Sequence, residues 1–467
     1  MKFKLIANCK QHLFDKETPI SIYLKVREHF NQCILLENSE RSIEKNHFSY
    51  ICFDPIAGIS VTGSNISKSF PGIATENTKL ESTTAALTEV VSFFKSFSIM
   101  ALPEGFEYPG LFGYFAYDSI RYFENIQITS SKDVTIPDIK YDLYRYVLII
   151  DHHKSEMALV TLRNEDEQPT TFAAIESILN NYNVASYPFK TTSKETSNCT
   201  DDEYLATVKK GKAHCYRGDV FQVVLSRSFQ LNFKGDDFNV YRALRAINSS
   251  PYLFYFDYNS FHLFGSSPEA QIKITPDKAT IYPIAGTYRR TGDTQKDQLL
   301  SAELINDKKE NAEHIMLVDL ARNDLSKHFA QVKVAEYRAV QYFSHVIHLV
   351  SKVEGEQLLD ASHPLKILAD TFPAGTLTGA PKHKAMTIID ELESTQRGFY
   401  GGCIGFAGFD GTLNKAIMIR SFLSKANTLH YQAGAGITVS SNPVNELQEI
   451  NNKINALRNA IEIANTL

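Results

Sequence analysis

The sequence predicts an α+β fold whose sheets are antiparallel or mixed. Segments that resemble strands and helices cluster along the chain and do not alternate strictly, unlike the βαβ arrays of parallel sheets. The 467 residues are 43% hydrophobic and 22% charged, which is the composition of a globular protein with a sizeable core. This length accommodates about three ordinary domains or about two larger ones.

The composition also argues against several classes of function. The net charge of −5 gives no electrostatic reason to expect a nucleic acid or a membrane surface as partner. No apolar run reaches the roughly 18 residues of a membrane span, and the first residues lack the pattern of a signal peptide. The six cysteines are scattered and include no Cys-x-x-Cys pair, so neither a disulfide framework nor a zinc site is indicated. A reducing cytoplasm is the expected compartment.

The N-terminal region, residues 1–186, is predicted to be rich in strands, with one or two helices before residue 150. The apolar segments 34–39 and 48–55 read as strands, and the second ends at an Asp-Pro turn signal. Segments 144–151 and 157–162 are expected to form a hairpin, which makes the intervening histidine pair part of a turn and not a metal site. The polar stretch 187–203 is the best candidate for a linker.

The second region, residues 202–467, mixes helices with strands. Its helices are expected from about 202 and near 237–247, 299–322 and 380–394. Its strands are expected at 220–227, in a hairpin-like series from 252 to 284, near 402–408 and 415–423, and just before a closing helix. The closing helix should begin at Pro443 after the capping candidates Ser441 and Asn442, because its apolar residues then recur at helical spacing.

Two of the expected helices carry glutamates one turn apart. Glu310 and Glu313 lie on the helix near 299–322, and Glu446 and Glu449 lie on the closing helix. If the two helices flank one cleft, their carboxylates suit Mg²⁺, which is usually held by one or two carboxylates together with water and substrate oxygens. A capped surface helix with solvated glutamates is the alternative for each helix alone.

Other segments carry polar side chains in apolar or glycine-rich surroundings. Residues 371–384 place hydroxyls and glycines before a helix, where N–H groups favour an anion, although a well-capped helix gives the same pattern. Arg420 follows an apolar run and is expected to pair with a carboxylate of the protein or of a ligand. His348 lies among apolar residues, where a core histidine bonded to the backbone is the first interpretation. The glycines around Cys403 imitate a nucleophile elbow, but a strand follows them, so Cys403 is read as a strand residue.

Six segments between about 205 and 460 follow the order of one family's motifs. They are Pro283-Ile-Ala-Gly-Thr287, Glu313-His-Ile-Met-Leu-Val-Asp-Leu-Ala-Arg-Asn-Asp-Leu325, Gly379-Ala-Pro-Lys382, Tyr400-Gly-Gly402 with Gly405, Gln432-Ala-Gly-Ala-Gly436 and Pro443-x-x-Glu446-x-x-Glu449. On these residues the chain resembles the chorismate-utilising enzymes. The N-terminal region is similar to that of the family through Leu35-Leu-Glu37, Ile51-Cys-Phe-Asp-Pro55 and Gly110-x-x-Gly113-Tyr-x-x-Tyr117-Asp118. The resemblance implies an α/β sandwich of two large antiparallel sheets covered by helices.

The resemblance also implies roles for single residues. Glu310, Glu313, Glu446 and Glu449 match the carboxylates around Mg²⁺, with Glu313 and Glu449 as the direct ligands. Tyr400 and Arg420 match the residues that hold the enolpyruvyl carboxylate of chorismate. Further substrate contacts are implied for the backbone at Ala435 and Gly436 and for Lys453, Gly286 and Thr287. Thr376 matches a hydroxyl that contacts the substrate, and His348 matches the histidine assigned to acid–base work.

Two positions favour the anthranilate synthase branch of this family. The branches that use water have a lysine base where Gln222 stands, and an amide cannot deprotonate water, so ammonia is the expected nucleophile. The aminodeoxychorismate synthases commonly have lysine where Ala285 stands. The implied reaction is Mg²⁺-dependent amination of chorismate followed by loss of pyruvate to give anthranilate, the first committed step of tryptophan biosynthesis. The alternatives are an aminodeoxychorismate synthase and a non-catalytic amino-acid sensor on the same fold.

The resemblance implies two partners in addition to chorismate and ammonia. No glutamine amidotransferase domain fits in this chain, so a separate small subunit is expected to supply ammonia from glutamine. Tryptophan is expected as a feedback inhibitor, bound by residues that match Glu37, Asn38, Pro251 and Tyr252. Asn38 departs from the serine usual in the resembling subunits.

Overall fold

A computed structural model describes residues 2–38, 48–100, 110–168, 172–181, 183–248, 250–342, 346–360 and 362–467, without the side chains of Thr287 and Lys309. Its helices are α1 (Pro19–Arg27), α2 (Ala85–Lys95), α3 (Ala173–Leu179), α4 (Asp201–Arg217), α5 (Phe238–Ile247), α6 (Thr294–Asn306), α7 (Lys308–Ser326), α8 (Pro364–Thr371), α9 (Gly375–Thr378), α10 (Lys382–Leu392) and α11 (Pro443–Ala464), with a 3₁₀ helix, η1 (Tyr117–Tyr122).

The strands are β1 (Phe3–Leu13), β2 (Ile34–Asn38), β3 (Phe48–Thr62), β4 (Asn65–Phe70), β5 (Ile73–Lys79), β6 (Phe97–Met100), β7 (Leu111–Phe115), β8 (Ile139–Asp151), β9 (Glu156–Asn164), β10 (Phe189–Thr191), β11 (Thr196–Ser197), β12 (Gln222–Gly235), β13 (Tyr252–Asp257), β14 (His262–Ser267), β15 (Ala270–Ile274), β16 (Lys278–Ile281), β17 (Ile284–Arg289), β18 (Phe329–Tyr342), β19 (Val346–Leu358), β20 (Gly379–Ala380), β21 (Cys403–Ala407), β22 (Leu413–Ile417), β23 (Ser421–Lys425) and β24 (Thr428–Ile437).

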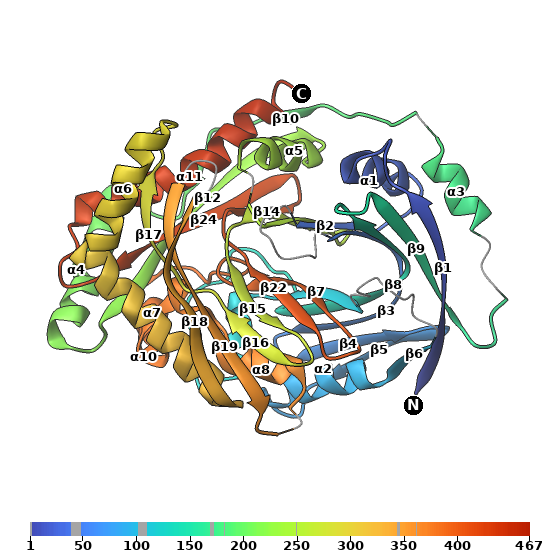
Figure 1. The fold of residues 1–467 in the computed structure, drawn as a ribbon, viewed down its shortest axis with the longest axis horizontal. Coiled ribbons are helices and arrows are strands. Elements are labelled where there is room, and N and C mark those ends of the chain that lie inside the picture. The colour runs from blue at the N-terminus through green and yellow to red at the C-terminus, as the bar shows by residue number, and fades with distance from the viewer. Residues whose placement is uncertain are drawn as a thin grey trace.

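These strands form two antiparallel sheets that share the long strands β3 and β8 (Figure 1). One sheet runs β6–β1–β9–β8–β3–β2–β13–β14–β23–β24–β12. The other runs β5–β4–β3–β8–β7–β21–β22–β15–β16–β19–β18, with β17 also paired to β19. A register shift in β3 between Pro55 and Ala57 lets its two halves enter different sheets. Among the described strands only the β1–β6 ladder is parallel, so the predicted α+β class is confirmed.

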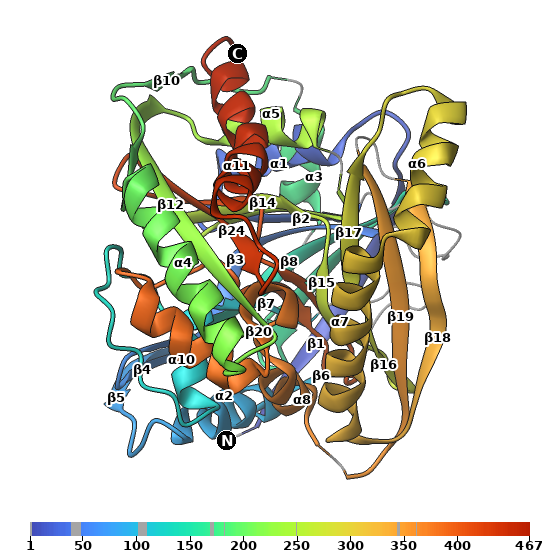
Figure 2. The same cartoon turned by 90° about the vertical axis from the view of Figure 1, so that its left-hand side faces the viewer.

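Two apolar clusters hold the layers together. Residues of β2 alternate between them, since Ile34 and Leu36 point into one cluster and Leu35 into the other. The first cluster joins side chains from both sheets. The second lies between the first sheet and helices α1, α4, α5, α10 and α11, and Figure 2 shows α4 and α11 against β12 and β24. Helices α6 and α7 cover the other sheet near β17, β18 and β19.

The N-terminal and C-terminal regions build both sheets together. Strand β2 pairs with β13 in the first sheet, and β7 pairs with β21 in the second. The segment 187–203, expected as a linker, contains β10 and β11, which pair with β12, and the start of α4. The division of the chain into two regions stays a prediction.

Two expected elements are in fact divided. The helix expected near 299–322 is α6 followed by α7, because Asp307 leaves the helical conformation and its carboxylate accepts the N–H of Glu310 at 3.0 Å. The strand expected near 415–423 is β22 followed by β23, because Arg420 between them has a φ of 48°. The apolar pattern continues through both breaks, so it does not reveal them.

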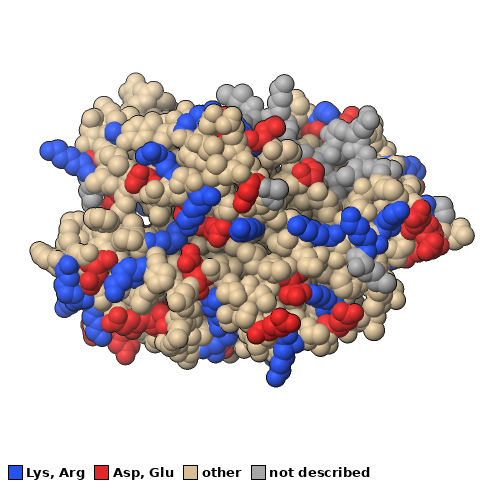
Figure 3. All heavy atoms as spheres, turned by 90° about the horizontal axis from the view of Figure 1, so that it is seen from below, with Lys and Arg blue, Asp and Glu red and all other residues tan. Residues whose placement is uncertain are grey.

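The described helices can be compared with the features of a membrane span, and one face of the molecule shows how its charges are distributed. No helix in the described segments is long and apolar enough to cross a membrane. On the face shown in Figure 3, acidic and basic side chains are interspersed. This mixture agrees with the small net charge of the chain.

Candidate active site

His348 lies on β19, beside β17. Its backbone faces Thr287, and a register shift between Ala285 and Thr287 turns the carbonyl of Gly286 toward the imidazole. His348 Nδ1 lies 3.0 Å from this carbonyl oxygen and therefore carries the hydrogen that it donates. Burial and the nearby Arg420 together lower the pKa of His348 to about 4, although the hydrogen bond to Gly286 acts in the opposite direction. The ring is thus neutral at physiological pH, which suits a proton acceptor.

Gly286 allows helix α7 to approach β17. Its φ of 76° is in the left-handed region, which glycine adopts readily. A Cβ at this position would lie 2.9 Å from Leu304 and 3.4 Å from the carboxylate of Glu310. The first glutamate of α7 is therefore next to the glycine that His348 contacts. The side chain of Thr287, also expected in the site, lies outside the described residues.

Glu269 joins the site from the connection between β14 and β15. Its Oε1 accepts a 2.9 Å hydrogen bond from the hydroxyl of Thr376, which lies on α9. Burial raises the pKa of Glu269 to about 7, while Thr376, Lys453 and Arg420 act in the opposite direction. Three of the predicted residues thus surround a carboxyl group that can exchange a proton near neutral pH.

Sequence reasoning did not identify Glu269. The signal available was a polar run, Ser266-Ser-Pro-Glu269, at the break between two apolar strands. Polar side chains at strand ends are common, so this signal alone is weak. The residue becomes conspicuous only because the fold brings it to Thr376, which is 107 positions away in the chain.

Arg420 lies in the turn between β22 and β23. Burial lowers its pKa, whereas the carboxyl of Glu269 raises it. One guanidinium nitrogen lies 3.4 Å from the side-chain oxygen of Asn248. A carboxylate partner was expected for this arginine; Glu269 acts on it electrostatically, but the two described side chains form no ion pair, so that pairing stays a prediction. Its guanidinium can also bind a carboxylate on a ligand.

The ladder between β12 and β24 supplies a glycine-rich wall. Gly436 pairs with Val224 and Ala435 with Leu225. A Cβ at Gly436 would overlap the amide of Gln222, so the glycine makes room for that side chain. The hydroxyl of Tyr400 lies against Gly434, where a Cβ would lie 3.0 Å from the hydroxyl oxygen.

Helix α11 packs its apolar face against β24, and the polar edge beside that face reaches the wall. Lys453 donates a 2.8 Å hydrogen bond to the carbonyl of Gly434 and lies 2.7 Å from Oε1 of Glu449. Glu446 is buried one turn before Glu449. Since Lys453 also influences Glu269, it connects the glutamates of α11 to the centre of the site.

The four predicted metal ligands lie in two pairs. Glu310 and Glu313 are half-buried on α7, and Glu446 and Glu449 lie on α11. Among the described residues, no group of three or more His, Cys, Asp or Glu side chains could by itself hold a metal ion. The oxygen donors fit the chemistry of Mg²⁺, which needs few protein ligands when a substrate supplies others. The metal site stays a prediction.

The residues expected to bind tryptophan meet through the β2–β13 ladder, where Asn38 pairs with Tyr252 and Glu37 with Leu253. Glu37 is only 4% exposed. Its carboxylate accepts hydrogen bonds from Tyr241 at 2.7 Å and from Arg245 at 2.8 and 2.9 Å. The carboxylate of this predicted tryptophan-binding residue is thus already bound to an arginine.

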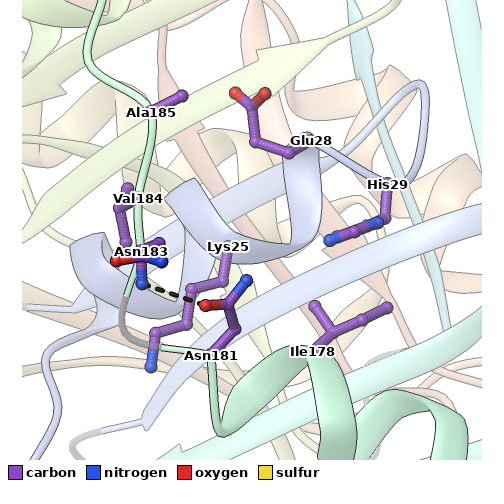
Figure 4. A pocket seen from close by; sticks show the side chains of 8 residues that line it. All are labelled: Lys25, Glu28, His29, Ile178, Asn181, Asn183, Val184 and Ala185. Carbon is purple, nitrogen blue, oxygen red and sulfur yellow. Dashed lines mark hydrogen bonds between the residues drawn. The ribbon is translucent and has the colours of Figure 1, made fainter.

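A separate open pocket of about 610 Å³ lies between α1 and residues 178–181 and 183–185 (Figure 4). None of the predicted site residues lines it. Lys25 at its edge binds Glu17 and the carbonyl of Leu179, both at 2.6 Å, and the backbone of Asn183 donates to the side chain of Asn181. Because no predicted site residue lines this pocket, it is separate from the candidate active site.

Comparison with known proteins gives a consistent result. The family model for chorismate binding enzymes matches residues 32–459. Anthranilate synthase component 1 of Aquifex aeolicus is 37% identical, over 99% of this chain and 96% of the relative. The protein of the same name from Bacillus subtilis is 35% identical, over 96% of this chain and 91% of the relative.

Two solved structures have the same fold. Anthranilate synthase component I from Streptococcus pneumoniae TIGR4 superimposes with a TM-score of 0.77 at 28% identity, covering 96% of this chain and 99% of the other. MenF, the menaquinone-specific isochorismate synthase from Escherichia coli, superimposes with a TM-score of 0.76 at 18% identity, covering 98% of this chain and 95% of the other. The second likeness concerns the fold alone.

Proposed function

The chain belongs to the chorismate binding enzyme family, and we propose that it is the component of an anthranilate synthase that converts chorismate and ammonia into anthranilate and pyruvate. This reaction is that of a lyase. The family membership supports an enzyme that uses chorismate, and the choice of ammonia as nucleophile is our inference.

The observation that carries this choice is the position of Gln222. Its buried side chain lies against Gly436 in the glycine-rich wall, at the place where the resembling water-using enzymes have a lysine base. An amide cannot remove a proton from water. Ammonia is itself a good nucleophile and needs no such base, so Gln222 suits amination and not hydration.

The surrounding residues can hold chorismate in one orientation. Arg420 and the hydroxyl of Tyr400 are suited to the enolpyruvyl carboxylate, because guanidinium and hydroxyl donors bind carboxylates strongly. Lys453 adds positive charge beside Gly434. Glu310, Glu313, Glu446 and Glu449 would hold Mg²⁺, which when bound would neutralise the ring carboxylate and polarise the ring.

Two groups can move the protons of the reaction. Amination replaces the ring hydroxyl, which leaves as water after accepting a proton, and Glu269 can supply that proton because its pKa is about 7. Loss of pyruvate then removes a proton from the aminated ring carbon and places one on the departing enolpyruvyl group. The neutral His348, with its hydrogen on Nδ1, can accept the ring proton at Nε2.

We also propose a partner and a regulator. A separate glutamine amidotransferase would release ammonia for this site, in keeping with the "component 1" in the names of the relatives. Tryptophan would inhibit the enzyme by binding near Glu37, Asn38, Pro251 and Tyr252.

The deciding experiment is identification of the products. The purified chain is incubated with chorismate, Mg²⁺ and ammonium at alkaline pH, and the products are separated by chromatography. Equal amounts of anthranilate and pyruvate are expected, with no turnover when glutamine replaces ammonium. Isochorismate or 4-amino-4-deoxychorismate as the main product would refute the proposal, and glutamine hydrolysis by the chain alone would refute the separate partner.

A further inference from the structure

Arg397 lies beneath the candidate active site and is only 1% exposed in its side chain. Its Nε donates to Oε2 of Glu393 at 2.9 Å, and its Nη2 donates to Oε1 at 2.6 Å. Oε1 of Glu393 also accepts the backbone N–H and the hydroxyl of Ser226, both at 2.8 Å. The arginine and its carboxylate therefore form a buried ion pair joined by two hydrogen bonds.

The same guanidinium binds two elements that build the site. Nη1 donates to the carbonyl of Leu377 at 2.6 Å, and Nη2 donates to the carbonyl of Val224 at 2.7 Å. Leu377 follows Thr376 on α9, and Val224 pairs with Gly436 across the glycine-rich wall. One rigid group thus fixes the distance between the turn that carries Thr376 and the strand that begins with Gln222.

Aromatic rings extend this network to the substrate side. The guanidinium carbon lies 4.8 Å from the ring centre of Tyr117 and 5.9 Å from that of Tyr400. These distances are within the range of attraction between a cation and an aromatic ring. The hydroxyl of Tyr400 meets Gly434 on the other side, so the ring is held between Arg397 and β24.

Gln432 connects the network to the neighbouring strand. Its side chain donates to the hydroxyl of Ser226 at 2.7 Å. The motif from Gln432 to Gly436 thereby contributes a buried polar anchor as well as its glycines. No role was predicted for Gln432 or Arg397 from the sequence.

A buried ion pair is weak evidence for stability alone, because desolvating two charges costs as much as their attraction returns. Here the hydrogen bonds of Arg397 end on the carbonyls of Leu377 and Val224 and on Glu393, which in turn holds Ser226 of β12, so all of them support a wall of the site. We propose that Arg397, oriented by Glu393, is a positioning residue that sets Tyr400 for binding the enolpyruvyl carboxylate of chorismate and the Thr376 turn for its own contact with the substrate. This inference rests on the proposed roles of Tyr400 and Thr376 in substrate binding.

The test compares Arg397→Lys with a matched control, Arg27→Lys. Arg27 also pairs with a carboxylate, that of Asp236, and lies 5.0 Å from the ring centre of Phe238, but it contacts no site residue. Lysine keeps the charge of each arginine and removes its planar fork. Binding of chorismate is measured by calorimetry with Mg²⁺ and without ammonium, together with KM, kcat and the melting temperature.

Arg397→Lys is expected to raise the Kd and KM for chorismate by about 10- to 100-fold, with a much smaller change in kcat, since loss of a supporting hydrogen-bond partner typically has that effect. Arg27→Lys is expected to leave both constants unchanged. Adding Tyr400→Phe to Arg397→Lys should cost little more, because the phenol is already misplaced. If Arg397→Lys changes only the melting temperature, or if the two losses multiply, the proposal is wrong.

Ser226→Ala decides the question if Arg397→Lys does not fold. It removes one hydrogen bond from Glu393 and leaves both charges in place, so a smaller rise in Kd is expected, again without further loss from Tyr400→Phe. An unchanged Kd, or losses that multiply, would overturn the proposal. Because chorismate binding is measured without ammonium, the result does not depend on which product forms, and failure to make anthranilate would refute only the proposed function.

Discussion

The hydroxyl of Thr376 donates a 2.9 Å hydrogen bond to Oε1 of Glu269, and this bond joins a residue expected from a sequence motif to one that was not. The carboxyl is buried, and its pKa is raised to about 7. At neutral pH it is therefore divided between the protonated and ionised forms. Glu269 is thus a proton donor beside Thr376, whose hydroxyl is predicted to contact the substrate. A donor at this position suits the departure of a hydroxyl group from the substrate ring.

Glu269→Gln should separate catalysis from stability. Glutamine keeps an acceptor for Thr376 but carries no transferable proton, so turnover should fall by about 10²–10⁴-fold. The pKa of Glu269 rises on folding from 4.5 to about 7. The protonated carboxyl thus contributes stability that is complete below pH 4.5 and is lost as the pH rises through 7, so the variant should be more stable than the wild type by roughly 3 kcal/mol at pH 8.

Chemical denaturation of both proteins from pH 4.5 to 8.5 measures this difference. The two stability curves should diverge as the pH rises, with the wild type falling below the variant. Thr376→Val serves as a control that removes the hydrogen bond and retains the proton. Parallel curves would show that Glu269 is ionised in the folded protein throughout this range.

His348→Met should slow loss of pyruvate more than amination. The neutral imidazole holds Gly286 through Nδ1, and its pKa of about 4 makes Nε2 a proton acceptor at physiological pH. Removing a general base typically costs about 10²–10⁴-fold in the step that it assists. The aminated intermediate should therefore accumulate, and chromatography of quenched reactions detects it. Equal slowing of both steps would indicate that His348 only orients the substrate.

Local sequence patterns predicted the elements better than the site. The start of α11 is confirmed, since Asn442 caps Val444 and Pro443 occupies the first turn. The cap and the proline each act on residues next to them in the chain, so the sequence alone is enough to predict them. The division at Asp307 was missed because one side-chain oxygen ends the helix without disturbing the apolar period.

The chemistry of the site depends on contacts that no local pattern contains. Glu269 and Arg397 acquire their roles from partners far along the chain, such as Thr376 and Val224. Their partners become visible only after the sheets form, because backbone carbonyls carry no sequence signature. The motif residues Tyr400, Arg420 and His348 could be predicted by resemblance, and the structure supplies the neighbours that set their protonation and orientation.

Glu449→Gln and Glu313→Gln should weaken Mg²⁺ binding without unfolding the protein. Both side chains are partly exposed, and Glu449 is paired with Lys453 at 2.7 Å. Loss of a carboxylate ligand is expected to reduce Mg²⁺ affinity in the presence of chorismate by at least about 10-fold. Calorimetric titration with Mg²⁺ measures this change in affinity directly. The dependence of turnover on Mg²⁺ concentration measures it independently.

Glu462→Gln is the matched control for the metal prediction. Glu462 is exposed on α11, the helix that carries Glu449, and lies about four turns after Glu446. Its replacement should leave Mg²⁺ affinity unchanged. Wild-type affinity in both Glu449→Gln and Glu313→Gln would exclude these residues as direct ligands.

Tryptophan inhibition should depend on the pairing of Asn38 with Tyr252 and on the carboxylate of Glu37. Because Arg245 already holds Glu37 with two hydrogen bonds, the ammonium of tryptophan must share or displace that arginine. We expect millimolar tryptophan to shift the chorismate saturation curve, since coupling between such sites is typically about 5- to 150-fold in affinity.

Asn38→Ser, which restores the residue usual in the resembling subunits, should lower the inhibitory concentration. Chorismate titrations with tryptophan, and with phenylalanine as control, measure both effects. A wild-type curve that tryptophan does not move would remove the regulatory assignment and leave the catalytic one intact.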